Sequence, residues 1–550
     1  MQNYDPVQRL GDEHMKLNRV SLKKAGIKLA FACFAFFGLS AQVAAFQAPI
    51  YKPEQLFPPS TGVPQIVEQK QSDNDLALPD HPGRKPIDPE KTKPKQSQPD
   101  RDKRKTSEAK PVRKGDTRVP GHPSRNLNAP SSIKEAQEDQ KDSMDEESDE
   151  GEEESEESEL PKYMLGVIPR EILGGGITFE AIYTGETFTK AKGGMVPSRR
   201  TNYRSNLDLV GIVDTGKLGW WDKGRFFVYG ENLTGGIISA DYIGETQLFS
   251  NLDSTVAPGL RPYYSTIAEY WYEQYWFDDM VSFRIGKQDT NAIFALTDLG
   301  GEFVNSSFGP PPPIPMPTFP SNSLGISTFF KLTDTATIGL GFFDGTPANG
   351  PQGVRWGFDT LGRNGTFSIY QAELKPQLGS QAELPTTIRL GMWHHSNHDI
   401  WTEFTPSPNP RTFSQNYGLF LTADQMIWKE NGAADEQGFG IFGQYHEVPA
   451  DRNSISRYFG SGLVYKGLLP NRDVDVFGVA MGQITFGNPY RLQNAVSGTI
   501  IAHDETIVET FYKYFWSPRL CLQPDVQYLA RPSGQYKDAL VAGLRFELIF

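Results

Sequence analysis

The sequence predicts an all-β fold, a transmembrane antiparallel β-barrel of about 16 strands preceded by a disordered N-terminal segment. From residue 161 onward, apolar and polar side chains alternate with a period of two, and turn-forming residues separate the alternating stretches. Long stretches with the helical period of 3.6 are not evident. The 390 residues from 161 to 550 give each of 16 strands about 24 residues, which is enough for a membrane-crossing strand and a turn or loop.

The start of the chain has the pattern of a secretory signal peptide over residues 1–45. Five basic residues between positions 16 and 28 precede an apolar run from Leu29 to Leu39, and Val43 and Ala45 fit a cleavage site after Ala45. The run is shorter than the roughly 20 residues that a membrane-spanning helix needs. We therefore favour a signal peptide over a transmembrane anchor.

Residues 46–160 form a charged leader in which no strand or helix period persists. Residues 84–114 contain 12 Lys and Arg against 5 Asp and Glu, whereas residues 141–160 contain 12 acidic residues and one lysine. A segment of this composition buries too little apolar surface to offset its conformational entropy, so we expect it to be disordered. A solvated spacer is the simpler interpretation, and contact with the cell wall or with cations is the alternative.

Residues 161–550 form the predicted barrel domain, and its last strand shows the alternation most clearly. One face of Ala539–Phe550 carries the apolar residues Leu540, Ala542, Leu544, Phe546, Leu548 and Phe550. The other face carries Val541, Gly543, Arg545 and Glu547. Successive side chains of a strand point to opposite sides of the sheet. Charged side chains are costly in a dry core but acceptable beside water, so we expect a polar lumen that conducts polar solutes.

The composition limits the alternatives. The formal net charge of −13 argues against a nucleic-acid-binding protein, and the mean hydropathy of −0.47 excludes a bundle of membrane helices. Removal of residues 1–45 would leave Cys521 as the single cysteine, which cannot form an internal disulfide. An aromatic content of 12% with abundant glycine and proline fits a barrel, although a large β-sandwich would have a similar composition.

Two glycine-rich motifs resemble nucleotide-binding loops but lack the expected context. Gly211–Lys217 matches the first seven positions of a phosphate-binding loop, but Leu218 stands where serine or threonine would bind magnesium. The second motif, Gly438–Gly443, is followed by residues that continue a strand and not by a helix. With no hydrolase motif either, we expect no enzymatic activity and no cofactor.

The strongest candidate for a metal site is the histidine-rich segment around position 395. On a strand, His394 and His395 face opposite ways, so only His395, His398 and Asp399 could converge. A zinc site usually needs a further ligand and supporting hydrogen bonds, and neither is visible. We interpret the segment as a polar strand end and expect no metal.

Several segments occur in an order that resembles a known family. They are Phe283–Asp289, Phe303–Phe308, Gly467–Asp475, Leu522–Tyr528 and Asp538–Arg545. Over roughly residues 170–550 the series is similar to the carbohydrate-selective porins of the OprB type. The resemblance implies a barrel in the bacterial outer membrane with both termini in the periplasm, through which glucose-like sugars diffuse passively. It also implies contact with outer-membrane lipid, and with the barrel-assembly machinery through the strand that ends at Phe550.

The resemblance further implies a loop that folds into the lumen and narrows it. The proline-rich segment Asn305–Pro320 occupies the matching place, and consecutive prolines would stiffen it. The candidate constriction residues are Asn305, Phe308, Pro310, Pro313 and Phe319. The alternative is a stiff extracellular loop.

Sugar recognition in water needs aromatic faces and charged or amide groups that bind hydroxyls. One face of the strand Ile267–Trp276 carries Glu269, Trp271 and Glu273, and we expect Arg284, Lys287 and Arg389 to join them along the sugar path. Generic lining of the lumen is the alternative for each residue. Two further functions stay open, a general or anion-selective porin and a structural or adhesive envelope protein anchored by the barrel.

Overall fold

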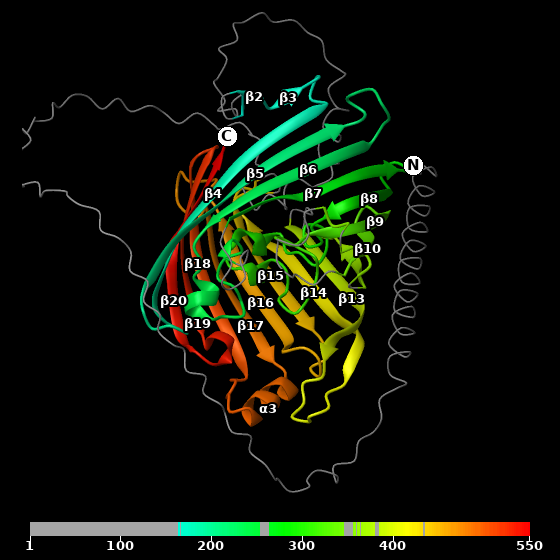
Figure 1. Cartoon of the computed structure of the whole chain (residues 1–550). Coiled ribbons are helices and arrows are strands. Elements are labelled where there is room, and N and C mark those ends of the chain that lie inside the picture. Colours follow the sequence, from blue (N-terminus) through cyan, green and yellow to red (C-terminus); the bar gives the residue numbers. More distant parts are fainter. Residues whose placement is uncertain are drawn as a thin grey trace, which may run out of the picture. The chain divides into compact units, whose positions relative to one another are not determined.

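The computed structural model describes residues 163–164, 167–253, 263–345, 356–358, 360–363, 365–379, 384–432 and 435–550 (Figure 1). The predicted signal peptide and charged leader lie outside these residues. In the described part of the chain, no helix is long and apolar enough to cross a membrane.

The described residues form a closed antiparallel barrel of 16 wall strands, as the alternation predicts. The strands are β4 (Ile177–Gly194), β5 (Arg200–Asp214), β6 (Gly224–Gly235), β7 (Tyr263–Trp276), β8 (Val281–Gln288), β9 (Ser323–Thr333), β10 (Ala336–Asp344), β11 (Thr366–Leu374), β13 (Leu384–Thr402), β14 (Thr412–Lys429), β15 (Gly438–Glu447), β16 (Ile455–Lys466), β17 (Val476–Phe486), β18 (Asp504–Ser517), β19 (Leu520–Ala530) and β20 (Lys537–Ile549). Two-residue strands β3 (Glu171–Ile172) and β12 (Gln377–Leu378) pair at the edges of the wall, and β1 (Tyr163–Met164) pairs with β2 (Ile168–Pro169).

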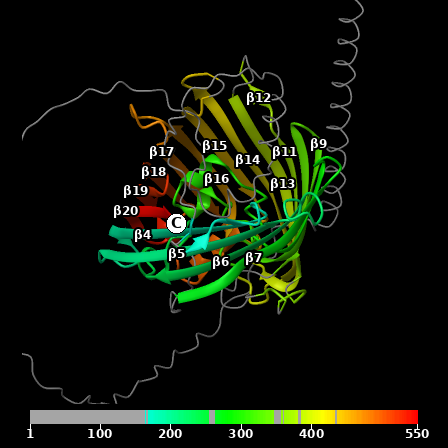
Figure 2. The same cartoon turned by 90° about the horizontal axis from the view of Figure 1, so that it is seen from above.

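The barrel closes where β20 pairs with β4, with Arg545 opposite Glu186. Because the sheet is closed, no wall strand has an unpaired edge. Lipid could not have supplied hydrogen bonds to the backbone N–H and C=O groups of such an edge. Seen from above, the strands surround a central space in which other segments of the chain lie (Figure 2).

The wall has the two faces that the alternation predicts. Outward apolar side chains are exposed, as for Val228 (49%), Leu390 (49%) and Leu544 (40%), whereas the alternating Arg284 and Arg545 are buried on the inner face. Exposed apolar side chains on a transmembrane barrel contact lipid. The inner face therefore holds the candidate functional residues.

The two ends of the barrel differ in their connections. At the end that holds the C-terminus, β7 and β8 are joined by residues 277–280, and Phe277, Asp278 and Asp279 adopt positive φ in this turn. Most of the connections at the opposite end are longer. These longer connections contain the π-helix η3 (Ser239–Ile243), the 3-10 helices η5 (Leu299–Glu302), η6 (Ser306–Phe308) and η7 (Pro532–Gly534), and the α-helix α3 (Asn488–Val496).

A charge on the outer face should destabilise the barrel. Leu421 of β14 is 41% exposed and pairs with Leu390 and Tyr445. We expect Leu421→Lys to lower the free energy of unfolding in lipid vesicles by about 2–4 kcal/mol if the site lies near the bilayer midplane. Urea titration followed by tryptophan fluorescence measures this loss. Asp334→Lys, at a turn position whose side chain is 97% exposed, is the control, and equal losses in the two variants would contradict the assignment of the outer face.

Candidate functional site: a lumen narrowed by two inward loops

The connection between β8 and β9, residues 289–322, folds back inside the barrel, and we call it the constriction loop. It lies against the inner faces of strands from β11 to β19. At one side the amide of Ala295 donates to Gln371 of β11 (2.9 Å), and at the other the amide of Gln523 of β19 donates to the carbonyl of Glu302 (3.0 Å). Between them, the hydroxyl of Tyr458 donates to the carbonyl of Ser307 (2.8 Å).

Two wall carboxylates hold this loop by its backbone. Asp424 accepts the amides of residues 298 and 299 at 3.1 and 2.9 Å, and Glu509 accepts those of residues 304 and 305 at 2.6 and 2.9 Å. Each carboxyl group thus satisfies two consecutive backbone donors of the loop, which would otherwise be buried without partners. The position of the loop is therefore determined by inward carboxylates of the wall.

A second loop that the sequence did not reveal also folds inward, and we call residues 236–253 the second inward loop. Glu505 of β18 accepts its amides at Thr246 (2.9 Å) and Gln247 (2.7 Å). The two loops bind each other, because the amide of Ser306 donates to the carbonyl of Leu248 (3.0 Å). The lumen is consequently narrowed by a pair of connected loops.

Part of the inner face is apolar, in contrast to the uniformly polar lumen that we expected. Phe303 and Phe308 of the constriction loop pack with Phe442 and Phe511 of the wall and with Phe249 of the second inward loop in one buried cluster. These wall residues contact the loops and not water, so the loops give the barrel a hydrophobic core.

The predicted constriction residues all lie on this inward loop. Asn305 and Phe308 are buried, and the side-chain amide of Asn305 donates to Gln527 of β19 (3.1 Å). Pro310, Pro313 and Phe319 lie on the limb that returns to β9, where the amide of Phe319 lies 3.4 Å from Asp289.

Four of the six predicted sugar-path residues occupy neighbouring positions on the inner faces of β7 and β8. The carboxylate of Glu273 accepts hydrogen bonds from Arg284 (2.8 Å) and Arg225 (2.8 Å). The indole of Trp271 is stacked on Phe227 with a centroid separation of 4.6 Å, and the Arg284 guanidinium lies 3.9 Å from its other face. Both faces of the indole are covered, so a sugar ring can stack on it only where Arg284 moves aside.

This part of the wall contains buried polar atoms that lack partners. Among the described residues, Asn206 Oδ1, Asp208 Oδ2, Glu269 Oε1 and Arg284 Nη1 have no hydrogen-bond partner. They come from β5, β7 and β8, and each residue is at most 4% exposed. Buried polar groups in native proteins are nearly always satisfied by protein or water. These acceptors and this donor are enclosed by neighbouring side chains, so a solute would reach them only where those side chains move.

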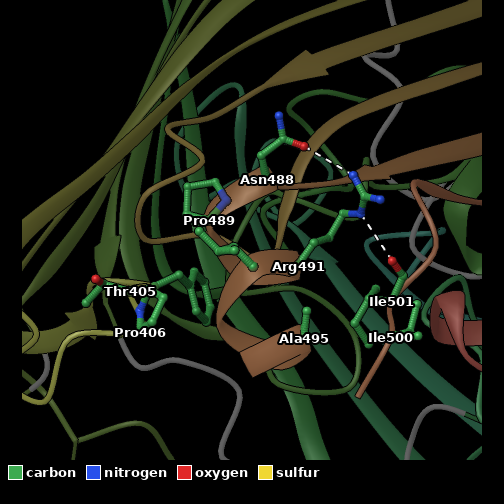
Figure 3. A pocket seen from close by; sticks show the side chains of 10 residues that line it. Thr405, Pro406, Asn488, Pro489, Arg491, Ala495, Ile500 and Ile501 are labelled. Carbon is green, nitrogen blue, oxygen red and sulfur yellow. Dashed lines mark hydrogen bonds between the residues drawn. The ribbon is translucent and has the colours of Figure 1, made fainter. Parts of the chain in front are cut away.

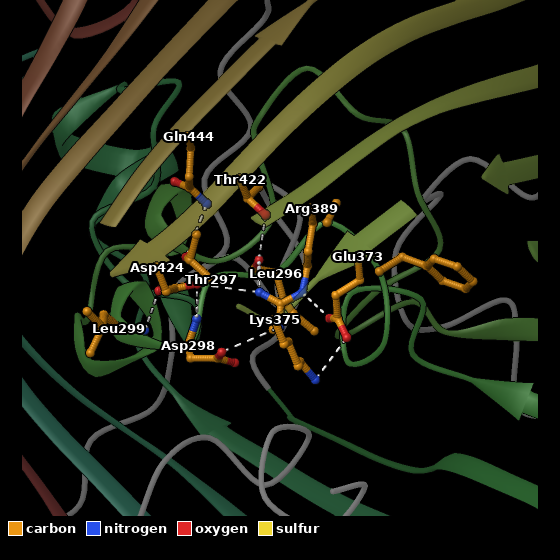
Figure 4. A network of polar contacts seen from close by, with 12 residues as sticks. Leu296, Thr297, Asp298, Leu299, Glu373, Lys375, Arg389, Thr422, Asp424 and Gln444 are labelled. Atoms are coloured by element: carbon orange, nitrogen blue, oxygen red, sulfur yellow. Dashed lines mark hydrogen bonds and ion pairs between the residues drawn. The ribbon is translucent and has the colours of Figure 1, made fainter. Parts of the chain in front are cut away.

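The other two predicted residues lie elsewhere. Lys287 pairs with Tyr270 and is three residues from Arg284, so it lies on the outer face. Arg389 of β13 is inward but is occupied by the constriction loop: it donates to Glu373 (2.8 Å) and to the carbonyl of Leu296 (3.1 Å) (Figure 4). Its contacts suit a residue that positions the loop.

The constriction loop turns an acidic edge towards the lumen. Asp298 is the one residue of 289–322, all of which are described, that is exposed, with 58% of its side chain accessible. Its basic partner, Arg389, lies 3.4 Å away and is buried behind it (Figure 4). Glu302 repeats the arrangement with buried Lys513 at 2.6 Å. We call Asp298 and Glu302 the acidic edge.

Only part of the histidine-rich segment has described side chains. The imidazole of His395 lies 2.8 Å from the carbonyl of Gly345, and the side chains of His398 and Asp399 are outside the described residues. Within the described part of the chain, no group of three or more metal-binding side chains converges.

A separate groove of about 610 Å³ (Figure 3) lies at α3, at the end of the barrel opposite the C-terminus (Figure 1). It is formed by the β13–β14 connection and α3, with Phe404, Pro489 and Leu492 among its lining residues. Arg491 donates to the carbonyl of Ile501 (3.2 Å) and so braces the loop beneath the groove.

The second inward loop should respond to pH through Glu245. Burial raises the pKa of this carboxyl to about 8, and the nearby Asp253 and Glu505 also raise it, while its hydrogen bond from Ser239 opposes the shift. A carboxyl whose pKa is raised by folding favours the folded loop below the unfolded pKa, and this advantage is lost as pH rises through about 8. Protease cleavage within 236–253 should increase as pH rises to about 8 and then level off, and Glu245→Gln should reduce this increase. An unchanged cleavage profile in the variant would contradict this role.

Comparison with known proteins identifies a family, a relative and a solved structure to which this chain is similar. The sequence profile of the family described as "Carbohydrate-selective porin, OprB family" matches residues 199–550. Porin B of Pseudomonas aeruginosa is 22% identical over 408 residues, which cover 69% of this chain and 89% of that protein. A solved structure of Pseudomonas putida OprB at high pH covers 68% of this chain and 94% of its own, with 21% identity and a TM-score of 0.61, which supports the fold.

Proposed function

Because the chain belongs to the OprB family of carbohydrate-selective porins, we propose that it passes small neutral, glucose-like sugars passively across the outer membrane. Porins of this family are channels and not enzymes. We further propose that the C-terminal end of the barrel faces the periplasm. The longer connections at the opposite end would then face the exterior.

The observation that carries the sugar proposal is the inner wall of β5–β8. Here Glu269 and Arg284, each with an unpartnered buried atom, lie beside Trp271: the indole N–H donates to Glu269 (3.3 Å), and the guanidinium of Arg284 lies over the ring. Asn206 and Asp208, which also have unpartnered atoms, lie further along the same inner wall on β5, where Tyr229 donates to Asp208 and pairs in register with Glu269. A sugar presents several hydroxyls that can donate and accept at once. Groups that are already buried need little further desolvation to bind them, so discrimination by hydrogen bonding can be strong.

An anion-selective porin is a weaker candidate. It would need cations facing the water, whereas at the acidic edge the carboxylates face the lumen and Arg389 and Lys513 lie behind them. A neutral solute is compatible with this arrangement.

Planar-bilayer conductance with and without glucose tests the proposal. If the pore binds sugar, glucose should reduce the ionic current in a saturable way. Arg284→Ala should weaken this block about 10- to 100-fold, because a buried charge-assisted hydrogen bond contributes about 1.5–3 kcal/mol. Trp271→Ala should also weaken the block, because the indole contacts both Arg284 and Glu269 and so positions them. Arg225 still pairs with Glu273 in the Arg284 variant, which protects the fold.

Arg457→Ala, at a position on β16 whose side chain is 58% exposed, is the matched control and should leave the glucose block unchanged. A pore that conducts ions but shows no glucose block in the native chain would refute the sugar assignment. An unchanged block in both the Trp271 and Arg284 variants would refute only the proposed path.

A further inference from the structure

The β10–β11 connection provides a segment that lies against the outer face of the wall. Its described residues 356–358 and 360–363 are here called the outer strap. The hydroxyl of Tyr270 donates to the carbonyl of Trp356 (2.5 Å), and the two rings lie 6.0 Å apart. Tyr270 alternates with the inward Trp271 on β7, so this contact is made on the outer face.

The strap lies over the position of a buried lysine. Lys287 pairs with Tyr270 on one side and Leu324 on the other, and the strap contacts both: a Cβ at Gly357 would lie 3.0 Å from Leu324 Cγ. Lys287 is only 2% exposed, and its ammonium donates to the carbonyl of Ile267 (2.8 Å). A lysine exposed to lipid on a barrel wall costs up to about 2–4 kcal/mol, depending on depth. Cover by the strap would avoid that cost.

The strap is fixed to the end of β10 by polar contacts. The carboxylate of Asp344 accepts a hydrogen bond from the hydroxyl of Thr360 (2.8 Å) and lies 3.3 Å from the amide of Gly362. The amide of Gly345 donates to the carbonyl of Gly365 (3.0 Å). These contacts hold both ends of the described segment close to the wall.

The side chains of the strap that do not face the wall are apolar. Trp356 is 55%, Phe358 66% and Leu361 56% exposed, and the neighbouring wall presents Ile285 and Ile326 at 45% and 40%. The apolar surface of the strap is thus continuous with the lipid-facing surface of the barrel. The wall is also short here, with 8 residues in β8 and 9 each in β10 and β11, compared with 18 in β4.

We propose that the outer strap is a lipid-contacting element that inserts Trp356, Phe358 and Leu361 into the adjacent leaflet. It would extend the apolar surface where the strands are shortest, which reduces hydrophobic mismatch, and it would shield Lys287 from the acyl chains. The inference does not depend on which solute the barrel passes.

Fluorescence quenching of a label on the strap tests the proposal. Phe358→Cys is made in the full chain with Cys33 and Cys521 replaced by serine, labelled with bimane and reconstituted in phosphatidylcholine vesicles. Lipids brominated on the acyl chain should quench this label about as strongly as a label at Ile326→Cys on the wall. Aqueous iodide should quench it about fivefold less than a label at Ser407→Cys, an exposed loop position at the same end.

A variant that lacks Tyr270, the wall residue that binds Trp356 of the strap, provides a second test. Tyr270→Ala should shift quenching at position 358 from the brominated lipid towards iodide, whereas Tyr445→Ala, another outward tyrosine, should not. A label at 358 that is quenched by iodide as strongly as the one at 407, and not by brominated lipid, would overturn the proposal. This result would be independent of conductance and of sugar binding.

Discussion

Glu509→Ala should release the constriction loop and raise the single-channel conductance about threefold or more, because pore width limits conduction. The Glu509 carboxylate is fully buried and accepts the amides of Val304 and Asn305. Its removal leaves two buried donors without a partner, at a cost of about 1–3 kcal/mol each. The loop can recover these hydrogen bonds by moving into water. A wider lumen should also lose its saturable block by glucose.

The measurement is single-channel current in a planar bilayer, with trypsin or chymotrypsin cleavage within 289–322 as an independent probe of loop release. Glu509→Gln, which keeps one acceptor oxygen, should give an intermediate conductance. Glu447→Ala, whose side chain is 56% exposed, is the control and should conduct like the native chain. Native conductance and native protease resistance in Glu509→Ala would show that the carboxylate does not hold the loop.

Thermal stability is a poor readout for this variant. Asp525 interacts with Glu509, so the substitution changes this contact as well as the contacts with the loop. The free energy of unfolding therefore reports more than the position of the loop. Conductance responds to the position of the loop alone and is therefore the decisive measurement.

The barrel could be predicted from the sequence because the alternation of apolar and polar residues is a local property of each strand. Alternation along Ala539–Phe550 sets which side chains face lipid, and the exposed Leu544 and buried Arg545 confirm it. The turn between β7 and β8 follows a local rule as well, because aspartate tolerates the positive φ that Asp278 and Asp279 adopt where the chain reverses. A period of two needs no knowledge of distant residues.

The inward loops depend on contacts between distant residues, and for this reason the second of them was missed. Glu505 binds residues 246 and 247, about 260 positions earlier in the chain. One local signal was available: Glu505 and Glu509 share a face of β18 with the apolar Ile507, and carboxylates in a partly apolar row need a partner. The signal indicates that something binds there but not which segment does.

The face of Lys287 could have been predicted, whereas the surroundings of Trp271 could not. Lys287 is an odd number of positions from Arg284, so alternation alone assigns the two to opposite faces. The stacking of Trp271 between Phe227 and Arg284 depends on the register of β6, β7 and β8. Register follows from the folded sheet and not from the pattern within one strand.

Asp298→Arg should change the ion selectivity of the pore from a preference for cations towards a preference for anions. The carboxylate of Asp298 is 58% exposed to the lumen, and its partner Arg389 is buried behind it and also paired with Glu373 and Asp424. A unit charge about 4 Å from a passing ion contributes about 1 kcal/mol in water, which is a factor of about five in local concentration. Reversal of the charge acts on both ions, so the permeability ratio of potassium to chloride should fall by at least about fivefold.

The zero-current potential in a potassium chloride gradient measures this ratio. Asp298→Asn should give about half of the logarithmic change, and Asp334→Asn, at an exposed turn outside the lumen, should give none. Uptake into liposomes separates charge from size: in Asp298→Arg the entry of glucuronate should rise while that of glucose stays the same. If both Asp298 variants keep the native potential, the acidic edge does not face the conducting path. If glucose entry falls together with the change in selectivity, the arginine narrows the pore, and Asp298→Asn then isolates the effect of charge because its side chain has the same size.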